Sequence, residues 1–202
     1  MNPLQILSDL IQIPAFSGEE NLRVTYLEKV LNDQGISTKK HLNNLWCVNQ
    51  HFSESKFTIL LNSHTDTVKP NKGYTREPHV AEVIDGKLFG LGSNDAGGPL
   101  ISLMTVFCEL YAENLPFNLV FAATAEEEIS GKNGIAALWP SLPKIDLAIV
   151  GVPTKMELAV AERGLMVLDC VAKGKAGHAA RNEGINAIYE ALKDIKWFKT
   201  HQ

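Results

Sequence analysis

Stretches with the apolar spacing of helices alternate along this chain with short apolar runs of the length of β-strands. The helical stretches cover residues 4–11, 22–31, 97–114, 134–139 and 183–198. The strand-like runs cover residues 45–52, 57–62, 80–84, 87–89, 117–123, 146–150 and 165–173. Ser17 is expected to cap the second helix, with Glu20 three residues on. The alternation predicts an α/β fold, with three layers around a mixed, partly parallel sheet.

The pattern changes after Arg163 and Gly164, which predicts a boundary between two domains. Residues 1–164 hold most of the expected helices and strands, whereas residues 165–202 offer one strand and one helix. Those two elements cannot bury their apolar faces alone. We therefore expect residues 165–202 to be the beginning of a second α+β domain that is cut short in this chain.

Composition narrows the class of partner. The 202 residues are 45% apolar and carry a net charge of −4 with both signs mixed along the chain, which argues against nucleic-acid and membrane binding. Met1 is followed by a stretch with helical spacing instead of a basic and apolar leader, and the longest apolar runs have the length of strands, so we expect neither export nor a membrane span. The three cysteines are far apart and in no CxxC motif, so we expect buried thiols in a reducing compartment. A cytoplasmic protein with a small-molecule partner is predicted.

An imidazole and a carboxylate follow directly on the strand-like run 57–62. His64 and Asp66 stand two residues apart, so their side chains point to the same side of an extended chain. This spacing suits a metal ligand, His64, whose other ring nitrogen is oriented by the Asp66 carboxylate. The alternative is an ordinary histidine at a strand end beside a solvated aspartate.

Asp95 lies in a segment of small residues, 90–98, where a helix is expected to begin. Small residues let the backbone approach a ligand closely. The segment has neither GxGxxG nor Walker spacing, which argues against a phosphate-binding loop. Two interpretations stay open: Asp95 binds a metal, or it caps the next helix.

Three adjacent carboxylates, Glu126, Glu127 and Glu128, come soon after the strand-like run 117–123. They would repel one another strongly unless cations were bound nearby. On an extended chain, alternation would let Glu128 face a metal while Glu127 faces the substrate as a general base. A solvated acidic loop is the alternative.

His64, Asp95 and Glu128 together form a donor set suited to zinc, and Asp95 could bridge two ions roughly 3.5 to 4 Å apart. Each of the three follows a predicted strand of one α/β domain. Chance would seldom arrange this, so the sequence predicts a two-metal hydrolase site.

The order of these motifs resembles the zinc aminoacylase and carboxypeptidase family, which includes acetylornithine deacetylase, succinyl-diaminopimelate desuccinylase and the glutamate carboxypeptidases. Residues 61–66 resemble its first ligand motif, residues 92–95 its bridging aspartate, and residues 124–128 its general base followed by a ligand. Residues 7–14 and 173–178 resemble the family's amino terminus and the start of its dimerisation domain. The resemblance runs over almost the whole chain.

This resemblance implies a site for two zinc ions, for which Co2+ or Mn2+ could substitute. His64 and Asp95 would hold one ion, and Asp95 and Glu128 the other. Glu127 would act as the catalytic base, while Asp66 would serve the reaction by orienting His64.

The resemblance also gives the second domain a role. Residues 165–202 would begin a dimerisation, or lid, domain, and the full-length form would be a homodimer. His178 would reach the active site of the partner subunit and stabilise the developing oxyanion there.

The chain departs from the family's pattern in two ways. Where the family has Gly-Glu-Pro-Thr, with the glutamate as a terminal ligand, residues 151–154 read Gly-Val-Pro-Thr, and the Val152 side chain cannot coordinate a metal. Family members also continue for another half-chain, which delivers a final histidine ligand without a counterpart here. Each zinc would then have two protein ligands, with Asp95 counted twice, where three are usual.

We therefore expect a zinc-dependent amidohydrolase that cleaves the amide bond of N-acyl amino acids, such as N-acetylornithine or an N-acylcitrulline in arginine biosynthesis. The change at Val152 and the length of the chain predict weak zinc affinity and little turnover. A dipeptidase or carboxypeptidase of the same family is one alternative. A catalytically inactive fragment that only binds or pairs is the other.

Overall fold

The computed structural model describes residues 1–161, 164, 166–181 and 183–201. The chain divides into two compact units, Met1–Leu158 and Ala159–Gln202. Among the described residues, no helix combines the length and the apolar character needed to cross a membrane.

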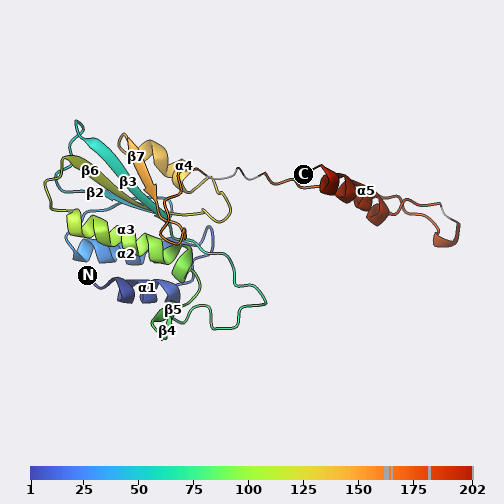
Figure 1. Cartoon of the computed structure of the whole chain (residues 1–202), viewed down its shortest axis with the longest axis horizontal. Coiled ribbons are helices and arrows are strands. Elements are labelled where there is room, and N and C mark those ends of the chain that lie inside the picture. The colour runs from blue at the N-terminus through green and yellow to red at the C-terminus, as the bar shows by residue number, and fades with distance from the viewer. Residues whose placement is uncertain (162–163, 165, 182, 202) are drawn as a thin grey trace. The chain divides into compact units, whose positions relative to one another are not determined.

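Five strands form the main sheet of the first unit, in the order β1-β2-β6-β3-β7 (Figure 1). They are β1 (Lys39–His41), β2 (Asn44–Val48), β3 (Phe57–His64), β6 (Phe117–Thr124) and β7 (Leu147–Val150). Strand β2 is antiparallel to β6, whereas β3 is parallel to both β6 and β7. The predicted mixed, partly parallel sheet is confirmed.

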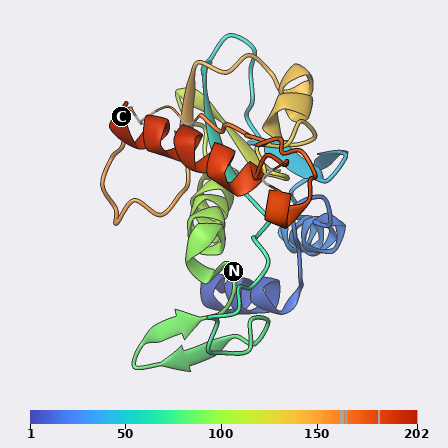
Figure 2. The same ribbon diagram turned by 90° about the vertical axis from the view of Figure 1, so that its right-hand side faces the viewer.

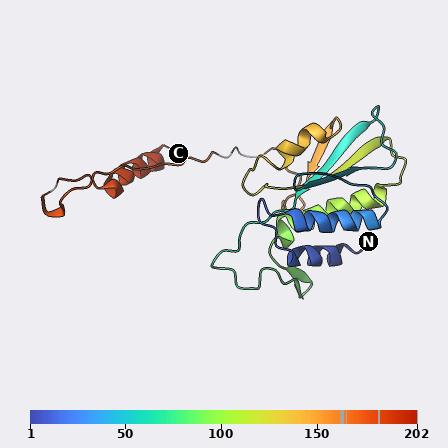
Figure 3. The same ribbon diagram turned by 180° about the vertical axis from the view of Figure 1, so that it is seen from behind.

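Helices lie on both faces of this sheet. One face is covered by α2 (Asn21–Asp33) and α3 (Gly98–Leu110), and α1 (Pro3–Gln12) packs against α3 on the side away from the sheet (Figure 1). The other face carries the short helix α4 (Ile135–Leu138) and the single turn η2 (Trp139–Ser141) (Figure 3). The first unit therefore has the three layers that the sequence predicts.

Apolar side chains fill the space on both sides of the sheet. On the α2 and α3 side, the fully buried rings of Phe107 and Phe121 lie with their centroids 5.9 Å apart. On the α4 side, Leu138 packs in a smaller cluster with Trp46 and Leu60. This packing holds the central strands β3 and β6 rigidly, which matters because the candidate site lies at their ends.

The central strands run side by side over their whole length. Their register pairs Phe57 with Phe117 at one end and His64 with Thr124 at the other. Because parallel strands present their carboxyl ends at the same edge of a sheet, His64 and the acidic segment 126–128 are brought to one place.

Some predicted strands differ from the structure. The run 80–84 forms a strand only over Glu82–Ile84 (β4), which pairs with β5 (Lys87–Phe89) in a hairpin outside the main sheet (Figure 2). The edge strand Lys39–His41 was not predicted, because its three residues are polar and exposed. Apolar spacing cannot reveal a strand that buries no apolar side chain.

Ser17 does not cap the second helix, so this prediction is wrong. Gly18 has a left-handed backbone with φ of 88°, which turns the chain before a helix can form. The helix begins only at Asn21, with Glu20 at the N-cap position and no side-chain capping bond. The Ser17 hydroxyl is thereby free for a contact with the candidate site.

The second unit contains the single turn η3 (Ala179–Arg181) and helix α5 (Ala187–Thr200). Helix α5 begins later than the sequence predicts because the Asn186 side chain accepts a hydrogen bond from the amide of Ile188 and caps it. This capping carboxamide was not recognised in the sequence.

The predicted strand 165–173 is absent over residues 166–173, and Leu165 lies outside the described residues. A strand needs a partner for its backbone groups, and this part of the chain shows only an isolated bridge between Lys175 and Ile185. Cys170, expected to be buried, is exposed for the same reason. The other two thiols are buried or half-buried, and all three cysteines are free.

Candidate metal centre

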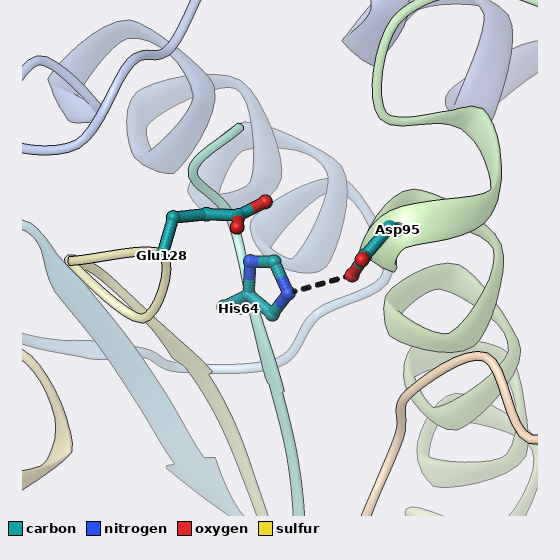
Figure 4. A group of neighbouring side chains, drawn as sticks. All are labelled: His64, Asp95 and Glu128. Atoms are coloured by element: carbon teal, nitrogen blue, oxygen red, sulfur yellow. Dashed lines mark hydrogen bonds and ion pairs between the residues drawn. The ribbon is translucent and has the colours of Figure 1, made fainter. Parts of the chain in front are cut away.

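Three side chains from separate elements converge at the carboxyl edge of the sheet (Figure 4). His64 ends β3, Asp95 lies in the turn η1 (Ser93–Gly97), and Glu128 lies in the loop after β6. One nitrogen or oxygen atom of each lies within 4.8 Å of those of the other two. An imidazole and two carboxylates at this spacing can hold a divalent cation.

The His64 ring is held in one orientation. The side chain is 3% exposed, and its Nδ1 lies 3.0 Å from the backbone oxygen of Asp66 and 3.4 Å from the Asp66 carboxylate. Both partners are acceptors, so the Nδ1 proton stays between them. The other nitrogen, Nε2, faces Asp95 Oδ1 at 3.1 Å and is the atom available to a metal.

Asp66 connects the histidine to the acidic loop. Its carboxylate is buried and accepts hydrogen bonds from the Ser17 hydroxyl at 2.7 Å and from the amides of Glu127 and Glu128 at 3.1 and 3.2 Å. Burial alone would raise the pKa of Asp66, but these bonds and the one from His64 outweigh it and hold the pKa below its ordinary 3.8. Asp66 therefore remains ionised while it orients the imidazole.

Asp95 does not cap α3, so that alternative interpretation is wrong. The N-cap position of α3 is Gly97, with no side-chain capping bond, and the Asp95 backbone is extended (φ −115°, ψ 102°). The turn packs against the end of β3 because Gly92 has φ of 75° and no side chain, and an added Cβ would lie 2.5 Å from Thr67 Cγ2. This close approach carries Asp95 to His64.

The acidic segment forms a turn, so the predicted alternation along an extended chain is wrong. The Ser130 amide donates to the Glu127 oxygen at 2.9 Å. Glu126 accepts from the amide and the side chain of Asn133 at 3.1 and 2.8 Å, away from the metal centre. Glu127 Oε2 instead lies 3.7 Å from His64 Nε2, and Glu128 belongs to the converging group.

The centre carries an excess of negative charge. Burial raises the pKa of Glu128, and Asp95 and Glu127 raise it further, although His64 opposes them. Burial lowers the pKa of His64, but Asp66, Glu127 and Asp95 outweigh this and raise it to about 9. A carboxyl group whose pKa is raised by neighbouring carboxylates, beside an imidazole whose pKa is raised by the same charges, is a sign of a site that a cation would stabilise.

We expect the stability of the metal-free chain to depend on pH through His64. Because folding raises the pKa of His64 from 6.5 to about 9, this stabilisation is fully present below pH 6.5 and is lost as the pH rises through about 9. Urea unfolding midpoints measured with a chelator should therefore fall across this range. His64→Gln should flatten the curve, and parallel curves for the two proteins would contradict the assignment.

Two positions predicted to matter, His178 and Val152, are not members of this group of three side chains. His178 belongs to the second unit, where its Nδ1 accepts from the Ala180 amide at 3.3 Å, so its role across a dimer stays a prediction. Val152 follows β7, whose Val150 pairs with Asn62 of β3. It offers no donor atom.

The sequence analysis did not identify Arg23, whose buried side chain holds the backbone next to His64. Arg23 is 4% exposed and donates from Nη1 to the Thr65 oxygen and from Nε to the Ile13 oxygen, both at 2.8 Å. A signal was present in the sequence, because Glu20 and Arg23 share the helical stripe of the buried Leu27. Charged residues on an apolar stripe indicate a buried polar network.

A three-layer α/β domain with an imidazole and carboxylates gathered at the ends of its parallel strands has the architecture of a metal-dependent hydrolase. Residues 60–196 match peptidase family M20/M25/M40, and the chain belongs to this family of hydrolases. The predicted family resemblance is confirmed.

Curated relatives are about one quarter identical to this chain over the aligned residues. Acetylornithine deacetylase of Buchnera aphidicola subsp. Acyrthosiphon pisum is 26% identical over 208 residues, covering 95% of this chain and 53% of that protein. Succinyl-diaminopimelate desuccinylase 2 of Ruegeria sp. is 26% identical over 211 residues, covering 96% and 53%. The chain spans about half the length of the curated relatives it matches.

Solved structures share the fold. The M20 family metallo-carboxypeptidase Sso-CP2 from Sulfolobus solfataricus aligns with a TM-score of 0.62 and 19% identity, covering 75% of this chain and 37% of that one. The YXEP protein of Bacillus subtilis, a dinuclear metal-binding peptidase of the M20 family, aligns with a TM-score of 0.56 and 17% identity, covering 73% and 41%.

Proposed function

We propose that this chain is a metal-dependent amidohydrolase acting on N-acyl amino acids, with zinc held by His64, Asp95 and Glu128. The observation that carries the proposal is the convergence of these three side chains within 4.8 Å in a member of peptidase family M20/M25/M40. The names of the curated relatives, an acetylornithine deacetylase and a succinyl-diaminopimelate desuccinylase, favour acylated amino acids as the substrate class. N-acetylornithine, and with it arginine biosynthesis, is our first choice.

The residues present fit a divalent cation. His64 offers a buried imidazole whose Nε2 is free of the Asp66 contact, and Asp95 and Glu128 add carboxylate oxygens. Asp95 has two oxygens and could be shared by two ions, as in a dinuclear site. When bound, zinc supplies Lewis-acid polarisation of the amide carbonyl and makes water a stronger acid, and Co2+ or Mn2+ could replace it.

Glu127 is the proposed general base. Its carboxylate is 57% exposed and lies 3.7 Å from His64 Nε2, so substrate and water can reach it at the edge of the centre. Glu127 Oε2 would accept the proton of the attacking water and return it to the leaving amine. Asp66 keeps the Nδ1 proton on His64 and so preserves the orientation of the imidazole.

The second unit enters the proposal through its resemblance to a dimerisation domain. We assign residues 1–164 to the catalytic domain and residues 165–202 to the beginning of the dimerisation domain of a cytoplasmic homodimer. His178 would then contribute to the site of a partner subunit by stabilising the oxyanion.

A second candidate function is a protein that binds or pairs without turnover. Val152 favours it, because the described part of the centre then provides three donor residues for two ions. Weak zinc affinity is expected in either case, with slow hydrolysis under the first proposal and none under the second. A dipeptidase or carboxypeptidase activity is the alternative within the family.

Calorimetric titration of the metal-free chain with zinc tests the proposal. We expect zinc to bind, His64→Ala to abolish binding, and His51→Ala, which removes an exposed histidine outside the cluster, to leave it unchanged. Hydrolysis of N-acetylornithine, N-succinyl-diaminopimelate and dipeptides at saturating zinc would then rank the substrates. A wild-type chain that binds no zinc would favour the second candidate.

A further inference from the structure

Three consecutive amides of the loop after β6 are each held by a carboxylate oxygen. The amides of Glu127 and Glu128 donate to the two oxygens of Asp66, at 3.1 and 3.2 Å. The amide of Glu126 donates to Glu20 Oε1 at 3.1 Å, across 106 residues of sequence. Asp66 already belongs to the proposed centre through His64. Glu20, by contrast, makes no hydrogen bond or ion pair to His64, Asp95 or Glu128 among the described residues, so its burial needs a separate explanation.

Glu20 is a fully buried carboxylate, with an exposed fraction of 0%. Besides the Glu126 amide, its Oε1 accepts from the Gly18 amide at 2.7 Å and its Oε2 accepts from Asn43 Nδ2 at 2.8 Å. Among the ion pairs of the described residues none includes Glu20. Burial of a carboxylate without a cation is costly and persists only where hydrogen bonds satisfy it.

Local helix stabilisation does not explain this burial. Glu20 stands at the N-cap position of α2, where a side chain would ordinarily accept from an amide of the first turn. Its side chain makes no such bond. The carboxylate reaches instead to the acidic loop, so its structural effect is on that loop.

The loop changes direction at the residue that Glu20 holds. Glu126 has a left-handed backbone with φ of 55°, a conformation that a non-glycine residue adopts only when its surroundings enforce it. The amide before this bend is fixed by Glu20 and the two amides after it are fixed by Asp66. Fixing three successive amides fixes the directions in which the Glu127 and Glu128 side chains leave the backbone.

We infer that Glu20 is a positioning residue that sets the bend at Glu126 and thereby aims Glu127 and Glu128 at His64. The inference rests on the proposed metal centre for its functional consequence. Glu20 itself would not contact metal or substrate, because its carboxylate oxygens accept hydrogen bonds from Gly18, Asn43 and the Glu126 amide.

Four variants separate positioning from charge and from general stability. Glu20→Gln keeps an oxygen that can accept from the Glu126 amide but removes the charge, whereas Glu20→Asp keeps the charge but is one methylene too short. Glu20→Ala removes both, and Asn43→Ala removes a hydrogen bond to the same carboxylate without touching the loop. All four are assayed in the full chain by zinc calorimetry and by hydrogen exchange of the amides of residues 126–128.

We expect Glu20→Ala and Glu20→Asp to weaken zinc binding about tenfold and to speed exchange of the three amides, while Glu20→Gln and Asn43→Ala stay near wild type. If Glu20→Ala fails to fold, the Asp and Gln variants decide the matter, because a role of charge alone would reverse their order. Zinc affinity that is equal in all variants, or that follows charge, overturns the inference while leaving the proposed function intact.

The two proposals can fail separately. If the wild-type chain binds no zinc, the proposed function fails, and amide exchange alone then decides the role of Glu20. Faster amide exchange at residues 126–128 in Glu20→Asp but not in Glu20→Gln supports the positioning role of Glu20. Unchanged exchange in both variants overturns that role.

Discussion

Replacing Asp66 by alanine is expected to lower the free energy of unfolding of the metal-free chain by about 3–5 kcal/mol, because removal of one partner from a buried charged network leaves the others unsatisfied. The Asp66 carboxylate is 1% exposed and accepts from the Ser17 hydroxyl and from the amides of Glu127 and Glu128. It also faces the Nδ1 of His64. The hydroxyl and the two amides would lose their acceptor, whereas His64 Nδ1 would keep only the backbone oxygen of residue 66.

The same substitution should weaken zinc binding by about tenfold to a hundredfold, since a ligating histidine depends on the group that orients its other nitrogen. Urea unfolding and zinc calorimetry measure the two effects. Asp9→Ala is a matched control, because Asp9 also accepts two side-chain hydrogen bonds, from Gln5 and Tyr26, but lies on α1 outside the cluster. Its cost should be about 0.5–1.5 kcal/mol.

A pH profile gives a further check on Asp66. Since its folded pKa lies below the ordinary 3.8, its stabilisation is present above that value and is lost as the pH falls through the folded pKa. The wild-type chain should therefore lose stability in acid more steeply than Asp66→Ala. Equal acid sensitivity, together with a cost no larger than that of Asp9→Ala, would contradict the central role of this carboxylate.

The sequence predicts the scaffold of the site well for a physical reason. Strands β3 and β6 are buried on both faces, so each appears as a continuous apolar run, and the polar residues that follow mark the strand ends. The sequence alone therefore places His64 and the acidic segment at one edge of the sheet. Asp95 could be placed there only through its small neighbours, since the close approach of Gly92 to Thr67 depends on tertiary packing.

The supporting contacts were beyond sequence reasoning because their partners are distant in the chain. Ser17 reaches Asp66 across 49 residues, and Glu20 reaches Glu126 across 106. Residue 126 has a positive φ of 55° but is not a glycine, so the sequence gives no sign of a bend there. The sequence therefore predicts an extended conformation for residues 126–128. In the structure a turn directs the side chains of Glu127 and Glu128 toward His64. The strand predicted over residues 166–173 is absent for a different reason. These residues have the β-propensity of a strand, but the described part of the chain offers no neighbouring strand with which they could pair.

The substitution Val152→Glu is expected to tighten zinc binding on the order of a hundredfold, about 2.8 kcal/mol, because it would give one ion a third protein ligand. Strand β7 runs parallel to β3 with Val150 opposite Asn62, and the Gly151 amide continues the pairing by donating to the Asn62 oxygen at 2.7 Å. Residue 152 stands two positions beyond Val150, as His64 stands two beyond Asn62. If the strand register continues beyond Gly151, residue 152 would reach the sheet edge at the level of the imidazole.

Val150→Glu is the matched control for this experiment. It adds the same charge to the same face of the same segment, but opposite Asn62 instead of His64. Both valines are partly exposed, at 58% for Val150 and 39% for Val152, so neither change empties the core. If the two variants tighten zinc equally, the gain is long-range attraction and residue 152 does not face the centre. If only Val152→Glu tightens zinc binding, residue 152 occupies a position from which a glutamate can bind the metal but valine cannot. That variant should then also hydrolyse N-acetylornithine faster.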